Sequence, residues 1–510
     1  MTTRGSSLAR NVLINLVGQL LPGVVAVVCI PIAVHGLGVQ RFSVLSLAWV
    51  LLAYLTVFDV GLGRAAIRFL SAALAERRLE RVAMIVWTTV AVEVLMGLVG
   101  GGVLAIATPF LVTHFLKVDL ALRTETAMSL YVLAATVPLL LVLNGLKGVL
   151  EANQRFDLVN LVRTLSSSAI FAAPAAGVLW HWRLPGILFA IGFSLLVTTL
   201  AYLALALRVC PGLRRRPIFE PSLLTRIFRF GGWVTVSSVL VPLIAYSDRL
   251  LITAFTSVAG LAYYSVPYEL TIRMQVIPNS IGTVLYPAFS AMPSGNAASS
   301  EISRLYASSL KYLLVLMAPI MLVLALFAHP ILSIWIDSGF AARGTAIMQL
   351  LALGVLLNSL AFVPIQLLDA RDRPNLRAMV FLVELMWYVP LAALLIVKFG
   401  LTGAAVSFVL RGLFDMTAFF VVAWPLSGLG SRVSPSAHGL ARAALVGLLL
   451  SAPSALIVKL NGDLSLVQLL LSALLMLAVI AVLWRFALDG DERIRLLHLF
   501  RHLRRSVEAV

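Results

Sequence analysis

Residues 229–292 read RFGGWVTVSSVLVPLIAYSDRLLITAFTSVAGLAYYSVPYELTIRMQVIPNSIGTVLYPAFSAM and contain two long apolar runs joined by a short turn at 257–260. A helix needs roughly 20 apolar residues to cross a bilayer, so each run is long enough to span a membrane. Four ionisable residues lie inside the runs: Asp248, Arg249, Glu269 and Arg273. Ionisable groups in hydrocarbon are costly and usually face a protein interior or a water-filled cavity. The stretch therefore predicts a membrane hairpin with a polar interior.

The four charges differ in how they can pair. Glu269 and Arg273 are four residues apart, with the acid on the N-terminal side, which is the better order for an ion pair on one helix face. They form either a self-neutralised structural pair or part of a binding site. Arg249 directly follows Asp248 and cannot share its helix face. Arg249 is therefore the better candidate for a cation that faces a ligand.

The composition agrees with a membrane protein throughout. Of 510 residues, 61% are hydrophobic and 12% charged, and the mean hydropathy is +1.01. A soluble domain carries about 25% charged residues. The apolar segments are continuous rather than alternating, which favours helices over a membrane β-barrel. The net charge of +17 is explained by basic cytoplasmic loops, so we expect no nucleic-acid partner.

Polar breaks divide the chain into helices of membrane-spanning length. We expect fourteen of them, at about 11–35, 42–63, 83–111, 126–149, 157–180, 185–208, 226–255, 260–290, 306–328, 344–368, 375–398, 402–424, 438–459 and 464–486. The longest basic connection, 209–225, leaves six helices before it and eight after it. The fold class is therefore an all-α polytopic membrane protein.

Lys and Arg are distributed unevenly between the alternate loops. With the N-terminus in the cytoplasm, only seven of the 39 basic residues fall outside, and three more lie within helices. The seven are Arg41, Lys117, Arg123, Arg183, Arg343, Lys398 and Lys459. Cytoplasmic loops carry the excess of Lys and Arg in membrane proteins. The pattern predicts that both termini are cytoplasmic.

The two halves of the chain also resemble each other weakly. At a constant offset of 219 residues, Arg10 corresponds to Arg229 and Ser46 to Ser265. Each half begins with a basic residue, continues as a long helix containing proline, turns at glycine and returns. Halves of six helices each would have parallel topology, related by an axis along the membrane normal.

Three amides form a row on the first expected helix. Asn11, Asn15 and Gln19 are spaced four apart, so they lie on one stripe that extends roughly 12 Å from the cytoplasmic end. Such amides can hold helices together in a membrane. Alternatively they form a hydrogen-bonding wall for a sugar or a lipid headgroup.

A basic pair ends the second expected helix. In FDVGLGRAAIRF, Arg64 and Arg68 share a face at the cytoplasmic boundary and Asp59 lies one turn further in. Arginines at helix ends commonly extend to the membrane surface. Two stacked guanidinium groups would also suit a phosphate or pyrophosphate, because the planar fork binds such oxygens bidentately.

Two acids near mid-membrane have no partner close in sequence. Glu93 and Glu384 are each either a proton or sodium site, or the partner of an arginine across the bundle. Asp59, Asp248 and Glu269 share the same alternatives of ion coupling or pairing.

Motifs for chemistry or cofactors are not found in the sequence. There is no phosphate-binding glycine loop in the required strand context, and no His, Cys and carboxylate cluster with ligand spacing. Cys29 and Cys210 fall near opposite membrane faces, so they cannot form an intramolecular disulfide. We expect no cofactor, no metal and no enzymatic activity.

Two segments have the look of a known family. RNVLINLVGQLLPGVVAVVCIPIAVHGLGVQRFSVLSLAWVLLAYLTVFDVGLGRA (10–65) and the YSDRLLI, VAGLAYYSVPYEL and VIPNSIGTVLYPAFSAM segments within 246–292 resemble polysaccharide-export flippases of the Wzx type. These belong to the multidrug/oligosaccharidyl-lipid/polysaccharide exporter superfamily, together with MurJ-type flippases and MATE antiporters.

The resemblance implies an architecture and a site. It implies an N-terminal lobe over 1–208, a cytoplasmic linker over 209–225, a C-terminal lobe over 226–424, peripheral helices over 438–486 and a basic cytoplasmic tail over 487–510. The cations of the family's central cavity correspond best to Arg249 and Arg273, with Arg64 and Arg68 near its cytoplasmic mouth.

The resemblance also implies a substrate and partners. The substrate would be an undecaprenyl-pyrophosphate-linked oligosaccharide, moved across the bacterial inner membrane by alternating access for O-antigen, capsule or exopolysaccharide assembly. Membrane lipids and a polymerase or export complex would be partners. The alternatives are a MATE-like drug or cation antiporter, although the first helix has no carboxylate, and a membrane glycosyltransferase or polymerase.

Overall fold

The computed structural model describes residues 2–59, 62–76, 79–116, 118–214, 239–292 and 296–427. The expected helices 438–459 and 464–486, the tail and most of the 209–225 linker lie outside these residues. Every regular element in the described ranges is helical. Eight of these segments are long and apolar enough to cross a membrane. The prediction of an all-α polytopic membrane protein is therefore confirmed.

The described helices fall into two compact units, which do not follow the chain in simple order. Unit 1 covers 1–273 and 377–407, and unit 2 covers 274–376 and 408–510. The expected division into lobes at 209–225 stays a prediction.

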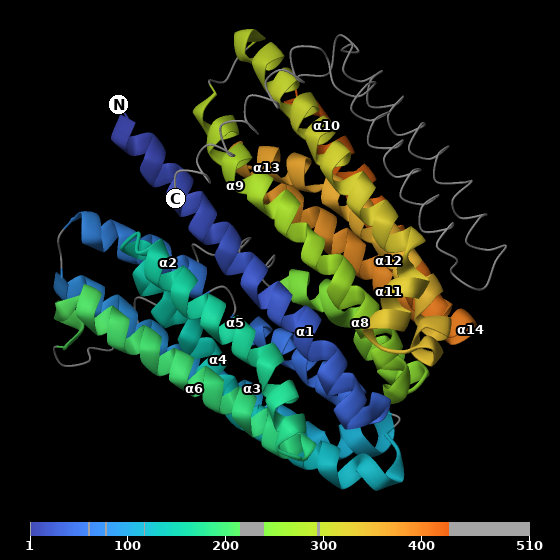
Figure 1. The fold of residues 1–510 in the computed structure, drawn as a ribbon. Coiled ribbons are helices and arrows are strands. Elements are labelled where there is room, and N and C mark those ends of the chain that lie inside the picture. The colour runs from blue at the N-terminus through green and yellow to red at the C-terminus, as the bar shows by residue number, and fades with distance from the viewer. Residues whose placement is uncertain are drawn as a thin grey trace. The chain divides into compact units, whose positions relative to one another are not determined.

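Unit 1 is a bundle of long helices (Figure 1). Its helices are α1 (Thr2–Leu55), α2 (Leu62–Ala75), α3 (Leu79–Phe110), α4 (Arg123–Ala152), α5 (Phe156–Leu179), α6 (Leu184–Val209), the helical residues 239–255, α8 (Val258–Ile272) and residues 377–407 of α14 (Pro374–Ala423). Helix α3 packs on α4, α4 on α6, and α1 on both α5 and α8. A buried apolar cluster joins α2, α3 and α4 to the end of α6.

Unit 2 contains shorter, more broken helices. They are α9 (Val276–Ala291), α10 (Asn296–Leu326), α11 (Ala328–Trp335), α12 (Ser338–Leu360), α13 (Phe362–Ala370) and the end of α14. Helix α12 packs on both α10 and α11, and α13 packs on α9. The Asp337 side chain begins α12 by accepting a hydrogen bond of 2.7 Å from the Phe340 N–H, as N-cap residues do.

Three expected helices are interrupted next to a proline. The expected helix 260–290 is divided into α8 and α9 by the 3-10 turn η5 (Arg273–Gln275), and Pro278 lies four residues after Met274 in that turn. Helix α10 ends four residues before Pro330, and α12 ends four residues before Pro364. Proline has no N–H to donate and its ring clashes with the carbonyl four residues earlier. These breaks follow from that chemistry.

The second expected helix, 42–63, is also divided. Helix α1 ends at Leu55, the 3-10 turn η1 follows (Thr56–Asp59), and α2 begins at Leu62. The Gly63 N–H donates to an Asp59 carboxylate oxygen at 3.3 Å. Asp59 therefore satisfies one of the free N–H groups at the start of α2.

The offset of 219 residues also relates structural features of unit 1. Gly38, where α1 is kinked at φ +75°, corresponds to Ser257, which caps α8. A positive φ is readily adopted by glycine alone. Ser43 corresponds to Ala262, and the Ala262 N–H donates to the Ser43 hydroxyl at 3.1 Å. A contact between equivalent residues is what a two-fold axis of an internal repeat produces.

Candidate functional site

Arg249 is a buried cation in the helical residues 239–255 of unit 1. Its side chain is 4% exposed. The guanidinium carbon lies 3.8 Å from the ring centre of Tyr268 and 5.0 Å from that of Tyr246. Its Nε and Nη2 have no hydrogen-bond partner among the described residues. Aromatic faces stabilise a cation, but two donors of this guanidinium remain available to an acceptor.

The Asp248 carboxylate lies within electrostatic range of Arg249, but the hydrogen bonds described for it do not go to the guanidinium. One carboxylate oxygen accepts a hydrogen bond from the Tyr264 hydroxyl, and the other accepts the Arg249 backbone N–H at 2.8 Å. Asp248, Arg249 and Tyr264 are all buried. The acid therefore holds the two helices of the hairpin together, because it binds α8 through Tyr264.

Arg273 lies in η5 and is more accessible than Arg249. Its Nη2 donates to Glu269 at 3.0 Å, with side-chain exposures of 20% for Arg273 and 24% for Glu269. The guanidinium lies 4.6 Å from the ring centre of Phe171 on α5. The pair that the spacing of four predicts is present. Its role in binding stays a prediction.

Arg249 and Glu269 lie within electrostatic range of each other. We call Asp248, Arg249, Glu269 and Arg273, with Tyr246, Tyr264 and Tyr268, the Arg249 cluster. Its two cations and two anions sum to zero. An anionic group bound here would complete the hydrogen bonding of Arg249, because two of its guanidinium nitrogens have no partner among the described residues.

The remaining residues predicted to bind substrate lie on the helices where the sequence predicted them. Asn11, Asn15 and Gln19 lie on α1, and Arg64 and Arg68 lie on α2. Their side chains lie outside the part of the chain that the structure describes, so their contacts stay predictions.

The two acids predicted at mid-membrane are both fully buried. Glu93 lies on α3 and Glu384 on α14, each 0% exposed. Neither oxygen of Glu93 has a hydrogen-bond partner in the described residues.

Sequence reasoning missed a polar chain in unit 2. The Gln275 amide donates to Asn358 at 2.8 Å, and the Asn358 amide donates to Asp415 at 2.7 Å. Asp415 follows Arg411 by four residues on α14, a spacing that favours a pair within that helix. Asn358 is 57 residues away, and no local spacing indicates such a contact.

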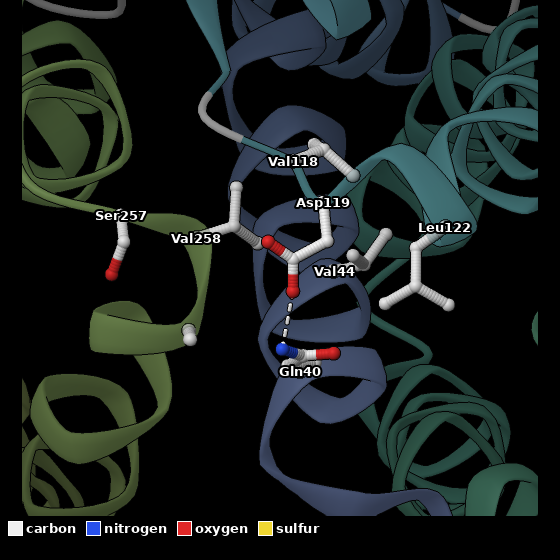
Figure 2. Close-up of a pocket in the computed structure, with 8 residues that line it drawn as sticks. Gln40, Val44, Val118, Asp119, Leu122, Ser257 and Val258 are labelled. Atoms are coloured by element: carbon white, nitrogen blue, oxygen red, sulfur yellow. Dashed lines mark hydrogen bonds between the residues drawn. The ribbon is translucent and has the colours of Figure 1, made fainter.

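A small cavity lies at the end of unit 1 that the charge pattern places outside. It has a volume of about 100 Å³ and lies between α1, the segment before α4 and the start of α8. In Figure 2, Asp119 points toward Gln40 and accepts its hydrogen bond, with Ser257 and Val258 on the adjoining turn. The cavity is too small for a sugar chain.

Metal ligands do not gather in the described residues, where no group of three or more His, Cys, Asp or Glu could hold an ion. Cys29 and Cys210 are free thiols.

Comparison with known families identifies the chain. The profile of the family described as "Polysaccharide biosynthesis protein" matches residues 8–293, more than half of the chain. This chain belongs to that family. The match contains the whole Arg249 cluster and Glu93.

Curated relatives support the membership. The chain is 28% identical to a Shigella flexneri protein named "Putative O-antigen transporter" over 80% of this chain and 96% of that protein. It is 22% identical to the "Probable low-salt glycan biosynthesis flippase Agl15" of Haloferax volcanii over 43% of this chain and 45% of that protein. The family is one of transporters and flippases, not of enzymes.

Solved structures show that this family member shares the fold of the exporter superfamily. A MATE multidrug transporter in an inward-facing conformation superposes with a TM-score of 0.66 at 14% identity, covering 82% of this chain and 96% of that chain. The lipid II flippase MurJ superposes with a TM-score of 0.64 at 12% identity, covering 95% and 99%. The resemblance predicted from residues 10–65 and 246–292 is confirmed.

Proposed function

We propose that this protein moves an undecaprenyl-pyrophosphate-linked oligosaccharide across the bacterial inner membrane by alternating access, for O-antigen, capsule or exopolysaccharide assembly. Membership in the polysaccharide biosynthesis family and the names of its glycan-transporting relatives support this proposal. Fourteen helices in two lobes, two peripheral C-terminal helices, and cytoplasmic termini are parts of the same proposal.

The observation that carries the proposal is the state of Arg249. Its guanidinium is buried, yet two of its nitrogens have no hydrogen-bond partner among the described residues. A buried donor without a partner is costly to a protein, and more so when it is charged. An anionic ligand would remove that cost, and the planar fork of arginine fits phosphate oxygens.

The proposed substrate class accounts for the presence of arginines inside membrane-spanning segments. An anion that enters hydrocarbon without a partner faces an idealised cost of about 20 kcal/mol per charge. Guanidinium groups along the path offset most of that cost while the lipid tail stays in the bilayer. We assign pyrophosphate contact to Arg249 and Arg273, with Arg64 and Arg68 at the cytoplasmic mouth, and glycan contact to Asn11, Asn15 and Gln19.

The membrane potential or ion exchange supplies the driving force in this proposal. Outward movement of an anion is favoured by an inside-negative potential, by about 2.3 kcal/mol per charge for each 100 mV. Dissipating both the potential and the ion gradients in loaded vesicles stops translocation. Undiminished translocation would rule this driving force out.

Arg249 variants test the proposed function directly. Arg249→Ala removes the charge, whereas Arg249→Lys keeps the charge but loses the bidentate fork. In cells, we expect Arg249→Ala to cause the lipid-linked glycan to accumulate in the cytoplasmic leaflet at an unchanged rate of synthesis. Arg249→Lys should retain partial transport.

The matched control is Arg155→Ala. Arg155 is also an arginine, but its side chain is 46% exposed and pairs with the exposed Asp157. It should leave transport unchanged, provided that all three variants reach wild-type membrane levels. Arg249→Ala with normal transport, altered drug resistance or a block in glycan synthesis would each contradict the proposal.

A further inference from the structure

Glu93 is a buried carboxyl group that is not part of the Arg249 cluster. It lies near the middle of α3 and is 0% exposed. Its carboxyl oxygens have no hydrogen bond of ordinary geometry among the described residues, and their nearest polar neighbour is the Gly145 backbone. Thr89, one turn earlier on the same face, also has a buried hydroxyl without a described partner. An ionised carboxylate is hardly tolerated in such a place, because burial without a partner penalises the charged form.

Helix α4 makes room for this carboxyl group at Gly145. A Cβ atom at residue 145 would lie 2.1 Å from Glu93 Oε2 and 2.7 Å from Oε1. The carboxyl group therefore lies directly against the α4 backbone, in a space that any other residue type would fill. By contrast, Gly102 on α3 has no atom within 4 Å of its Cβ position, so it provides a control for the effect of a methyl group.

A second carboxyl group, that of Asp59 in η1, lies within electrostatic range of the first. It binds the N–H of Gly63, which itself lies against the Asn144 backbone, next to Gly145. Asp59 is partly exposed, whereas Glu93 is not. A negative charge on Asp59 opposes ionisation of Glu93, because like charges repel.

The remaining titratable groups on the packed helices do not neutralise Glu93. On α4, Lys147 and Glu151 pair with each other at 3.8 Å. His114, in η2 beyond α3, is about 30 Å further along at 1.5 Å per residue. Helix α2 carries Arg64 and Arg68, whose side chains lie outside the described residues. Asp59 is thus the charged neighbour that the described geometry provides.

We propose that Glu93 and Asp59 form a proton-binding site, in which Glu93 is protonated while α3 and α4 are packed as described. The proton reaches Glu93 from solvent through Asp59 and returns the same way, so that carboxylate and proton become carboxylic acid without any other change of bond. Loss of the proton leaves a buried anion, which moves away from Gly145 and shifts η1 and α2. The role of this site rests on the proposed transport function. In that role, proton binding would be coupled to movement of α2, the helix that carries Arg64 and Arg68.

The first experiment detects the proton itself and needs no glycan. Infrared spectra of the purified full-length protein in lipid are recorded in acidic and alkaline buffer. We expect the difference between acidic and alkaline spectra of the wild type to contain a protonated-carboxyl C=O component that is missing from the same difference for Glu93→Gln, since the other carboxyl groups of the chain contribute equally to both. Identical difference spectra for the two proteins would overturn the proposal.

The second experiment detects the coupled movement. Hydrogen–deuterium exchange of residues 56–75 is compared between the same buffers, after correction for the chemical dependence of exchange on pH. The wild type should lose protection there in alkaline buffer, whereas Glu93→Gln, which stays neutral and keeps nearly the same shape, should not. Gly145→Ala should lose protection in both buffers, because its Cβ displaces the carboxyl group. Gly102→Ala should behave like the wild type.

Two further outcomes are decisive. Protection that depends on NaCl, with choline chloride as the control, rather than on pH would show a sodium site and overturn the proton site. Equal pH dependence in the wild type and Glu93→Gln would do the same. Neither measurement involves substrate, so their failure is distinguishable from failure of the transport function, which the Arg249 variants test.

Discussion

Arg249 and Arg273 lie in neighbouring apolar helices but have different partners. Arg273 pairs with Glu269, as a spacing of four predicts. Arg249 has an acid beside it in sequence, but Tyr264 from α8 occupies that carboxylate. Spacing along one helix can therefore predict a pair within it. It cannot predict competition from a side chain on the next helix, and that competition leaves Arg249 with free donors.

Glu125 also has partners on other helices, and these contacts should stabilise the fold. Its carboxylate accepts three hydrogen bonds of 3.1 Å from the Nε and Nη2 of Arg41 and one of 3.0 Å from the Leu184 N–H, so it joins α1, α4 and α6. We expect Glu125→Ala to lower the free energy of unfolding by about 1–2 kcal/mol, less than a fully buried site because Arg41 is partly exposed. Denaturant unfolding in detergent measures the change.

Asp157→Ala is the control for that variant. Asp157 pairs with Arg155 at 2.9 Å, but both side chains are about half exposed, at 56% and 46%, and exposed ion pairs contribute little. Its stability should equal that of the wild type. Equal losses for the two variants would show that Glu125 acts only as a surface charge.

At the scale of helices, glycine and proline decide contacts and boundaries. Prolines 278, 330 and 364 each follow a break by four residues, but Pro138 lies inside the unbroken α4, and α14 continues past Pro390 to its kink at Gly400. A proline in a sequence is thus a possible break, and the surroundings decide whether the helix continues. The α3–α4 contact depends on glycine instead. A Cβ on Gly97 would lie 2.4 Å from Pro138 Cα, and one on Gly101 would lie 2.5 Å from the Ala134 carbonyl oxygen.

Glycine-to-alanine substitutions along α3 should therefore change the free energy of unfolding in opposite directions at different positions. Gly97→Ala and Gly101→Ala place a methyl group against the α4 backbone, which cannot move aside as a side chain can, and we expect a loss of about 1–3 kcal/mol. Gly102→Ala meets no neighbouring atom within 4 Å and should gain about 0.5–1 kcal/mol from the lower flexibility of the unfolded chain. Unfolding of the purified variants checks both. Similar effects at all three positions would contradict the described α3–α4 contact.

For the molecule as a whole, α1 packs against α8 in unit 1, at residues that the offset of 219 relates. Ser43 accepts the Ala262 N–H at 3.1 Å, and its single hydroxyl proton lies within reach of the Val39 carbonyl at 2.8 Å and the Ala259 carbonyl at 3.2 Å. Charge distribution puts this contact toward the outer face. Alternating access requires the outer ends of these helices to separate during transport.

A cross-link at this contact tests that requirement. In a chain with Cys29 and Cys210 replaced by Ser, we expect Ser43→Cys with Ala262→Cys to form a disulfide. Export of the glycan should stop under oxidising conditions and recover on reduction. Each single cysteine variant is the control and should export under both conditions. Full export with the disulfide formed would show that α1 and α8 stay together throughout transport.

The sequence by itself determined that the protein is helical, polytopic and similar to polysaccharide flippases, because hydrophobic length and residue identity are local properties of the chain. It also determined the Glu269–Arg273 pair, since both residues lie on one helix. Only the tertiary structure decided that the Tyr264 hydroxyl donates to Asp248 and that the Glu93 carboxyl group lies against Gly145. It also decided that Asn358 bonds to both Gln275 and Asp415. These contacts join residues on different helices, and their energies depend on which groups become buried together, which no spacing along the chain specifies.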